Sequence, residues 1–358
     1  MIPEQNNLNT EEKTISKKET KKRKPLIIVL ISLLCIIAII VATLFTMQLI
    51  GKNKLVNNQD VVIELPEDLI ASEEDGKTII YKGETYEFNE NVTSILCMGI
   101  DKTEISDSSF GANGQADSVF ILTIDTKTGK TNIIPINRDT IVDSYIYSES
   151  GEFIKTEKQQ ICLVYANGDG KEISCNNMVK SVSSMLYGMP INSYMAIDLN
   201  AIGVLTEAVG GITVVSPETF SSRTKNFYEG KEITLDDKYS ATAFVQYRDK
   251  TKLDSNEKRI ARQKIFLSAF ANKSIAKTKE NIAFPLNLYN LVSDYNQNNI
   301  DASKITYLTS CVMKQGANIS TNFLTINGET KQGDIYAEFY PDKESLLDLV
   351  VKVYYTKK

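Results

Sequence analysis

An almost unbroken apolar run covers residues 26–47 and directly follows a basic block. At about 1.5 Å per residue, a helix of this length crosses a hydrocarbon core of roughly 30 Å. The basic block consists of Lys17, Lys18, Lys21, Lys22, Arg23 and Lys24. Positively charged flanks stay in the cytoplasm, so we expect a single-pass membrane protein whose N-terminus is cytoplasmic and whose C-terminal part is extracytoplasmic.

A cleaved signal peptide is the alternative interpretation of this run. Such a peptide has a shorter apolar core, followed by small residues at the cleavage site. Residues 46–50 offer no site of that kind, which favours an uncleaved anchor. We therefore expect a basic cytoplasmic tail over residues 1–24, a transmembrane helix over 25–50, an extracytoplasmic linker over 51–90 and one folded domain over 91–358.

Composition narrows the chemistry that the exported domain can use. The net charge is −5, and the basic tail leaves the exported part more acidic still, so a nucleic-acid partner is not expected. The chain contains no histidine, which excludes His-based triads, His metal sites and His general bases. Chemistry must use carboxylates, Arg, Lys, hydroxyl groups or an oxygen-bound metal. Cys162 and Cys175 are open to two interpretations, a disulfide or two free thiols.

Apolar periodicity predicts strands interleaved with helices. The expected strands cover residues 94–100, 118–124, 131–136 and 212–215, and the second and third form a hairpin. The expected helices cover residues 178–186, 202–209, 259–276 and 286–295, with a last helix that Asp342 caps and that runs through residue 352. This order predicts a layered α-β-α domain of the α/β class with a central mixed sheet.

Two aspartates stand at the ends of neighbouring predicted strands. Asp101 ends the first strand and Asp117 begins the second, so an antiparallel or adjacent pairing would bring both carboxylates to one edge of the sheet. Such a pair suits Mg²⁺, which takes one or two carboxylates and completes its coordination with water and phosphate. The alternative is that Asp101 is an ordinary turn residue.

Arginines also gather at the ends of the predicted elements. Arg138 follows an apolar strand, and Arg248 follows a second apolar segment. Arg259, Arg262 and Gln263 share one face of a predicted helix. Guanidinium groups match phosphate oxygens bidentately, so these residues are phosphate ligands or, alternatively, partners in surface salt bridges.

Seven short blocks occur in a fixed order over about residues 92–270, and together they resemble the LytR-CpsA-Psr family. The blocks are MGID at 98–101, ADS at 116–118, INRDT at 136–140, VYANG at 164–168, AVGGI at 208–212, FVQYR at 244–248 and RIARQ at 259–263. The resemblance implies a Mg²⁺-dependent, membrane-anchored enzyme of cell wall biogenesis in Gram-positive bacteria. Such an enzyme moves a phosphorylated glycopolymer, a teichoic acid or capsular polysaccharide, from a polyprenyl-pyrophosphate carrier to peptidoglycan.

The same resemblance implies roles for individual side chains. Asp101 and Asp117 would hold Mg²⁺, and Asp117, Arg138 and Asp139 would be catalytic. The expected pyrophosphate ligands are Arg138, Gln246, Arg248, Arg259 and Gln263. Either Asp139 or a metal-bound carboxylate would take the proton of a sugar hydroxyl. Phe266 and Phe270 continue the helix face that carries Arg259, where they would line a lipid tunnel or, alternatively, pack in the core.

Two positions depart from the family pattern. Gln115 and Gln246 stand where the family usually carries arginine. Each replacement removes a formal charge and keeps amide donors. The alternative function is therefore a divergent member that binds polyprenyl pyrophosphate as a scaffold or envelope regulator.

Overall fold

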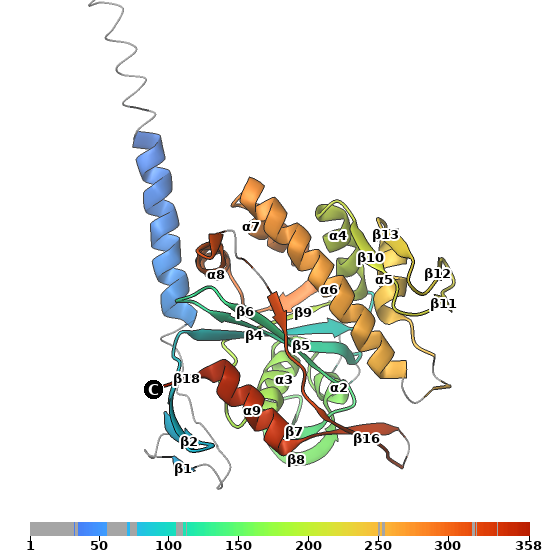
Figure 1. The fold of residues 1–358 in the computed structure, drawn as a ribbon. Coiled ribbons are helices and arrows are strands. Elements are labelled where there is room, and N and C mark those ends of the chain that lie inside the picture. The colour runs from blue at the N-terminus through green and yellow to red at the C-terminus, as the bar shows by residue number, and fades with distance from the viewer. Residues whose placement is uncertain are drawn as a thin grey trace, which may run out of the picture.

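A six-stranded mixed sheet forms the centre of the molecule (Figure 1). The computed structural model describes residues 32, 35–55, 70–71, 77–104, 110–111, 113–249, 251–252, 255–316, 319, 321–334 and 336–358. The strand order is β14 (Asn296–Asn298), β9 (Ser193–Ile197), β4 (Val92–Ile100), β5 (Ala116–Asp125), β6 (Thr131–Ile136) and β15 (Thr321–Phe323). β4, β5 and β6 are antiparallel neighbours, whereas β9 runs parallel to β4 and β15 parallel to β6.

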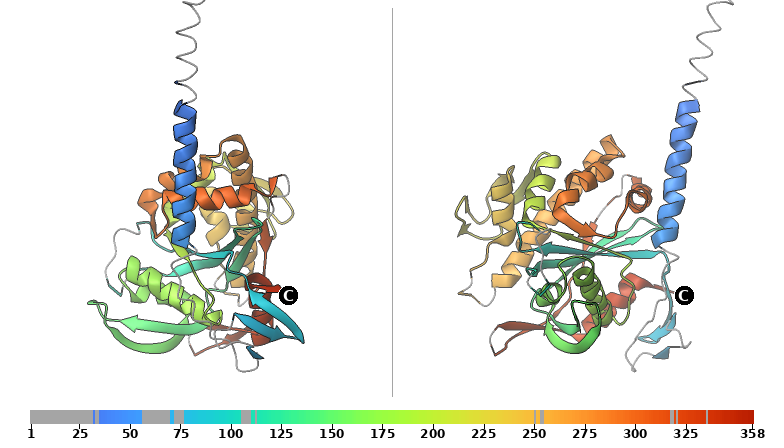
Figure 2. Two further views of the ribbon diagram at one scale, coloured as in Figure 1. Left: turned by 90° about the vertical axis from the view of Figure 1, so that its left-hand side faces the viewer. Right: turned by 180° about the vertical axis from the view of Figure 1, so that it is seen from behind.

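Helices cover both faces of this sheet, as the layered α/β prediction requires (Figures 1 and 2). One face carries α2 (Ile161–Val164), α3 (Glu172–Met185) and α9 (Lys343–Tyr354), and the other carries α6 (Ser255–Glu280), α7 (Phe284–Leu291) and α8 (Ala302–Met313). Side chains alternate across the strands, so Leu96 packs in the cluster of α3 and α9 while Ile95 packs with α8. A third cluster joins α6 to α4 (Leu199–Ala208) and α5 (Lys238–Gln246).

Several predicted elements are confirmed with their local causes. β5 and β6 form the expected hairpin, whose turn is closed by Asp125 accepting from the backbone N–H groups of Lys127 and Thr128. Helix α4 stops before Gly210, whose φ of 81° is a conformation that favours glycine. Asp342 caps α9 by accepting from Ser345 N at 2.8 Å. The expected fourth helix is α7, followed by the 3₁₀ turn η2 (Ser293–Tyr295).

The remaining strands form small two-stranded sheets around the core. They are β7 (Ile141–Tyr147) with β8 (Phe153–Gln160), β10 (Ile212–Val215) with β13 (Glu232–Leu235), β11 (Phe220–Ser221) with β12 (Asn226–Phe227), and β16 (Gly328–Gln332) with β17 (Ala337–Pro341). A 3₁₀ turn, η1 (Tyr165–Asn167), follows α2. In Figure 1, the sheets of β10 with β13 and of β11 with β12 lie beside α6 at the right of the view, and β7 and β8 lie below the central sheet.

Part of the expected linker belongs to the folded domain. β1 (Ile70–Ala71), β2 (Thr78–Tyr81) and β3 (Glu84–Phe88) form a four-stranded sheet with the C-terminal β18 (Tyr355–Lys357). Ile79 on β2 is fully buried in the main core. Residues 56–69 and 72–76 of the expected linker lie outside the described residues.

Within the described residues, one helix is long and apolar enough to cross a membrane. It spans Cys35–Leu55, with a mean hydropathy of 2.0, and both an anchor and a signal sequence fit that description. Its C-terminal end contacts the domain, because Leu55 is buried and its carbonyl accepts from Asn192 Nδ2 at 2.8 Å. The basic tail over residues 1–24 and the start of the apolar run lie outside the described residues.

Candidate active site around Asp117

A β-bulge directs Asp117 out of the regular sheet. Gly99 pairs with Ser118 and Ile100 pairs with Ala116, so Asp117 has no partner on β4. The backbone N–H groups of Asp101 and Asp117 both donate to the Gln115 carbonyl at 3.0 Å. A bulge of this kind turns a side chain away from the pleat. The two aspartates therefore meet at one edge of the sheet, as the strand pairing predicted.

The Asp117 carboxylate holds two guanidinium groups. Oδ1 accepts from Arg138, which follows β6, and Oδ2 accepts from Nη1 of Arg259 on α6 at 3.1 Å. Arg259 is 4% exposed and Arg138 14%, so water screens these pairs only weakly. Burial lowers the pKa of Arg259, and the Asp117 charge opposes that shift. One carboxylate from the sheet thus fixes two cations from different elements.

Arg138 has two further neighbours that its sequence context did not reveal. Its Nη2 donates to Gln115 Oε1 and contacts Cys162 Sγ at 3.1 Å. Burial raises the pKa of the Cys162 thiol to about 11, so this thiol is neutral beside the guanidinium group. Cys162 and Cys175 are both free in the structure, which therefore has two thiols rather than the disulfide.

Asp139 is the buried carboxylate of the site, 5% exposed. Asn256 Nδ2 donates to its Oδ2 and Gln160 Nε2 donates to its Oδ1, each at 3.2 Å. Burial raises the pKa of Asp139, while Arg138 and other nearby arginines oppose the rise. A buried carboxylate with a raised pKa is suited to accept a proton.

Asn256 links Asp139 to Arg259. Besides its bond to Asp139, its Nδ2 donates to Asn137 Oδ1 at 2.6 Å, and its Oδ1 accepts from Arg259 Nη2 at 2.7 Å. Sequence reasoning missed Asn256, Gln160 and Cys162. For Asn256 there was a signal, because it lies three residues before Arg259 on one helix face.

A groove opens between this cluster and α6. Gln263 lies in it: its Oε1 accepts from Ser118 Oγ at 3.5 Å, and its Nε2 donates to the Val245 carbonyl at 3.3 Å. The groove is lined by Asp117, Ser118, Val119, Phe120, Pro135, Ile136, Arg138, Asn256, Ile260, Gln263, Lys264 and Leu267. The lining combines charged and amide groups with aliphatic and aromatic groups, which suits an amphipathic anion.

The structure places two of the expected pyrophosphate ligands apart from this groove. Arg248 lines a neighbouring polar pocket with Lys252 and Arg262, and its Nε donates to Ser255 Oγ at 3.0 Å. Its charge still acts on Asp139. Gln246 ends α5 with an exposed side chain and lines neither pocket.

Three other residues of α6 have side chains that pack in the interior of the domain. Arg262 is 1% exposed, donates to the Phe244 carbonyl at 2.8 Å and pairs with Glu218. Phe266 and Phe270 stack with their ring centroids 6.5 Å apart and pack in the cluster of α4, α5 and α6. Core packing, the alternative to a tunnel lining, is therefore what the structure shows for both phenylalanines.

The predicted Mg²⁺ ligands fit a cation only with help from a substrate. Asp101 is exposed, and its Oδ1 accepts from the Gln115 N–H group, whereas Asp117 is engaged by arginines. Among the described residues, no group of three or more Cys, Asp or Glu side chains is placed to hold a metal ion. Mg²⁺ commonly binds to one or two carboxylates when phosphate oxygens and water complete its shell. The donor set is therefore compatible with a cation that arrives with a phosphate.

Comparison with known proteins agrees with the resemblance. The LytR_cpsA_psr family model matches residues 67–350. The polyisoprenyl-teichoic acid–peptidoglycan teichoic acid transferase TagU of Oceanobacillus iheyensis is 25% identical over 249 residues, 69% of this chain and 71% of that protein. Biofilm regulatory protein A of Streptococcus mutans is 32% identical over 133 residues, 36% of this chain and 29% of that protein. The crystal structure of TagV of Bacillus subtilis superposes with a TM-score of 0.58 at 25% identity, over 74% of this chain and 96% of that one.

Proposed function

Because the chain belongs to the LytR_cpsA_psr family, we propose that it is a transferase of the cell envelope. In this proposal the enzyme moves a phosphorylated glycopolymer from a polyprenyl-pyrophosphate carrier to peptidoglycan. Relatives named as teichoic acid transferases support a polymer of that class. The single observation that carries the proposal is the convergence of Arg138 and Arg259 on Asp117, beside a groove whose lining includes Ile260, Leu267 and Phe120.

The charges of the cluster suit a pyrophosphate. Asp139 lies in the field of three arginines, Arg138, Arg248 and Arg259, and of one other carboxylate, Asp117. Cations therefore outnumber carboxylates in a partly dry site, where charge-assisted hydrogen bonds are strong. Guanidinium groups held in place before the reaction stabilise the negative charge that develops on the bridging oxygen.

The reaction forms one bond and breaks one. A hydroxyl oxygen of peptidoglycan attacks the phosphorus attached to the glycopolymer, and the bond from that phosphorus to the bridging oxygen breaks. Polyprenyl phosphate leaves with the electron pair. Asp139 accepts the hydroxyl proton, because its raised pKa and its hydrogen bonds from Asn256 and Gln160 hold it ready as a base.

Mg²⁺ is part of the proposal as the cofactor. Asp101 and Asp117 would hold it together with phosphate oxygens, and the cation would add Lewis-acid neutralisation of phosphate charge. The walls of the groove, with Ile260 and Leu267 on α6 and Phe120 on β5, would bind the first isoprene units of the carrier. The N-terminal helix would be an uncleaved anchor, with its N-terminus cytoplasmic and the domain outside.

The alternative proposal is a binder of polyprenyl pyrophosphate that acts as a scaffold or regulator. Two observations favour it. Gln115 contributes an amide in place of the arginine usual in the family, and Gln246 is exposed and does not line the groove. One relative is named a biofilm regulatory protein. A binder would hold the lipid without releasing polyprenyl phosphate.

The test uses full-length protein, because removing residues before 91 would delete β2 and β3 from a sheet of the folded domain. A polyprenyl-pyrophosphate-linked glycopolymer and a peptidoglycan fragment are supplied with and without Mg²⁺, and both released polyprenyl phosphate and the linked product are quantified. We expect metal-dependent transfer that is lost in Arg138→Ala. The matched control is Arg223→Ala, whose side chain is exposed, and it should retain activity. Binding without release in the wild type would favour the scaffold.

A further inference from the structure

The N-terminal helix is fixed to the domain at a defined contact. A Cβ on Gly51 would lie 2.2 Å from the Ser303 carbonyl, so the helix backbone touches α8 directly. Leu55 is 1% exposed, and Lys54 pairs with Asp301 at the cap of α8. A helix held by its backbone has a set direction relative to the domain. The side of the domain toward which it points is therefore the side that meets the bilayer.

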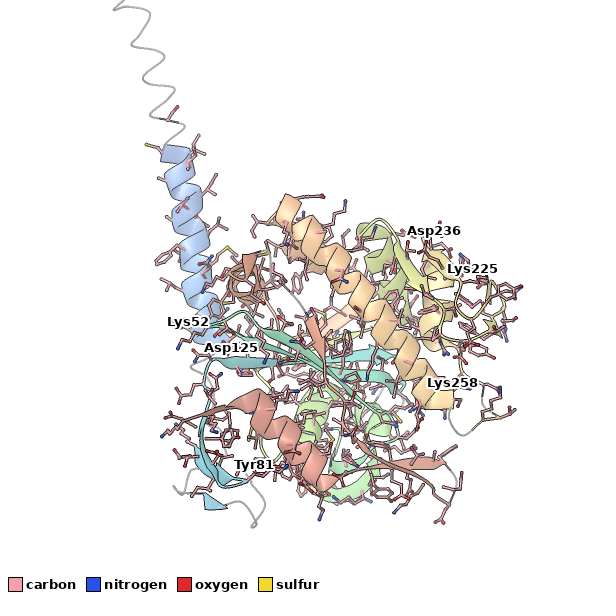
Figure 3. The ribbon with its side chains drawn as sticks, in the orientation of Figure 1. Lys52, Tyr81, Asp125, Lys225, Asp236 and Lys258 are labelled. Carbon is pink, nitrogen blue, oxygen red and sulfur yellow. The ribbon has the colours of Figure 1, made fainter. Side chains whose placement is uncertain are left out.

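The end of α6 and the whole of α7 lie on that side. In Figure 1 and in both views of Figure 2, they rise from the sheet in the same direction as the N-terminal helix. Their upper end lies level with the apolar part of that helix and not with its docked end, which Lys52 marks in Figure 3. A part of the domain therefore reaches the height at which the anchor enters the bilayer.

The surface there has the composition of a membrane-interface segment. We call it the α6–α7 corner and define it by Lys273, Lys279, Ile282 and Leu291. Ile282 is 60% exposed and Leu291 52%, and α7 has no buried residue. Lys273 and Lys279 are exposed along the last turns of α6. Long lysine side chains can reach headgroup phosphates while neighbouring apolar side chains enter the acyl boundary.

Acidic groups near the α6–α7 corner reduce its electrostatic attraction to anionic lipid headgroups. Glu280 and Asp294 are exposed in the same region, so the local excess of positive charge is small. The apolar side chains must therefore provide most of the binding free energy, through the burial of apolar surface. A lipid bilayer fits this chemistry because it presents an apolar layer beneath polar headgroups.

We propose that the α6–α7 corner inserts into the extracytoplasmic face of the bilayer that the N-terminal helix spans. The proposal rests on the membrane anchor of the proposed function. Two attachments fix the orientation of the domain relative to the bilayer, where the docked helix alone could still tilt and rotate together with the domain. Helix α6 then runs from the bilayer to the candidate site, because its other end, which Lys258 marks in Figure 3, carries Arg259 and the groove residues Asn256 and Ile260.

The chain contains no tryptophan, so a single introduced indole reports its own surroundings. Ile282→Trp and Leu291→Trp are reconstituted as full-length proteins in vesicles of phosphatidylcholine and phosphatidylglycerol with brominated acyl chains. We expect blue-shifted emission and quenching by the bromine in both. Phe153→Trp is the matched control, since Phe153 is 56% exposed on β8 below the opposite face of the sheet, and it should stay unquenched (Figure 1).

A second control distinguishes the membrane anchor from the docking of the α6–α7 corner. Phe45→Trp lies in the apolar helix and should be quenched if that helix spans the bilayer. Quenching at 45 with none at 282 and 291 would overturn the docking and leave the anchor standing. No quenching at 45 would overturn the anchor and the docking together. In the Leu291→Trp background, Ile282→Asp should lower the quenching, because it places a charge in the proposed apolar contact; unchanged quenching would contradict the proposal.

Discussion

Arg259 Nη1 donates to Asp117 Oδ2 across 3.1 Å, although 142 residues separate the two in the chain. This bond fastens the start of α6 to the bulge of β5. Because Asp117 also pairs with Arg138, a single carboxylate sets the spacing of two guanidinium groups. A phosphate that enters the groove meets cations already in position and need not order them.

Replacing Asp117 with asparagine should weaken the fold and the site together. Asp117→Asn keeps the side-chain shape but removes the carboxylate that Arg138 and Arg259 share, so that among the described residues Arg138 keeps only its pair with Asp139. We expect a loss of about 2–4 kcal/mol in the free energy of unfolding, because one partner of a buried ion pair is removed. Urea unfolding measures it. Asp143→Asn is the control, since Asp143 pairs with the exposed Lys158, and it should cost less than about 1 kcal/mol. Equal losses in the two variants would contradict the assignment.

Placing an arginine at position 115 should lower the stability of the free protein and raise its affinity for a prenyl pyrophosphate. In the structure Gln115 Oε1 accepts from Arg138, so Gln115→Arg replaces an acceptor with a second cation. We expect a lower melting temperature without ligand and a tighter Kd for a short-chain prenyl pyrophosphate, by about tenfold for one added charge-assisted contact. A thermal-shift titration gives both quantities. An unchanged Kd would show that position 115 does not face the bound phosphates.

The raised pKa of Asp139 predicts a pH dependence of stability. Since burial raises the pKa of the folded carboxyl, protonation favours the folded state, and this contribution is lost as the pH rises through the folded pKa. Asp139→Asn cannot titrate. Its stability relative to the wild type should therefore increase as the pH rises above about 4, the ordinary pKa of an aspartate, while transfer is lost. Unfolding curves at several pH values test this, and parallel pH dependences in the two proteins would contradict it.

The docking of the N-terminal helix depends on the absence of a side chain at residue 51. Gly51→Val would force the helix away from Ser303, with a packing cost of about 1–3 kcal/mol. Amide hydrogen exchange in α8 should then rise, since Ser303 and Tyr307 are buried in the docked state. Lys52→Val is the control, because Lys52 is exposed on the same turn of the helix. Equal exchange in the two variants would argue against the dock.

Elements with strong apolar periodicity could be predicted from the sequence. The hairpin of β5 and β6 and the glycine that ends α4 are where the pattern placed them. The hairpin of β16 and β17 could not be predicted, because every residue of β16 is exposed and no apolar alternation marks it. The sheet of β2, β3 and β18 was missed for another reason. It pairs strands from the two ends of the domain, which local patterns do not relate.

The site could be predicted in part. Strand pairing brought Asp101 near Asp117, and helical spacing placed Arg259 and Gln263 on one face. The bulge that turns Asp117 toward α6 depends on a one-residue shift in register, which the residues alone do not reveal. The displacement of Arg248 into a second pocket comes from the packing of α5 against α6. The contact between Cys162 and Arg138 is likewise a product of tertiary structure.

We propose that the arginines around Asp117 form a pyrophosphate site. The Kd of a short-chain prenyl pyrophosphate tests this for the full-length wild type, Arg138→Ala and the exposed control Arg223→Ala, measured by calorimetry in detergent with Mg²⁺. We predict that Arg138→Ala weakens binding about ten- to hundredfold, as the loss of one charge-assisted contact implies, and that Arg223→Ala leaves it unchanged. Equal Kd values for all three proteins would contradict the account.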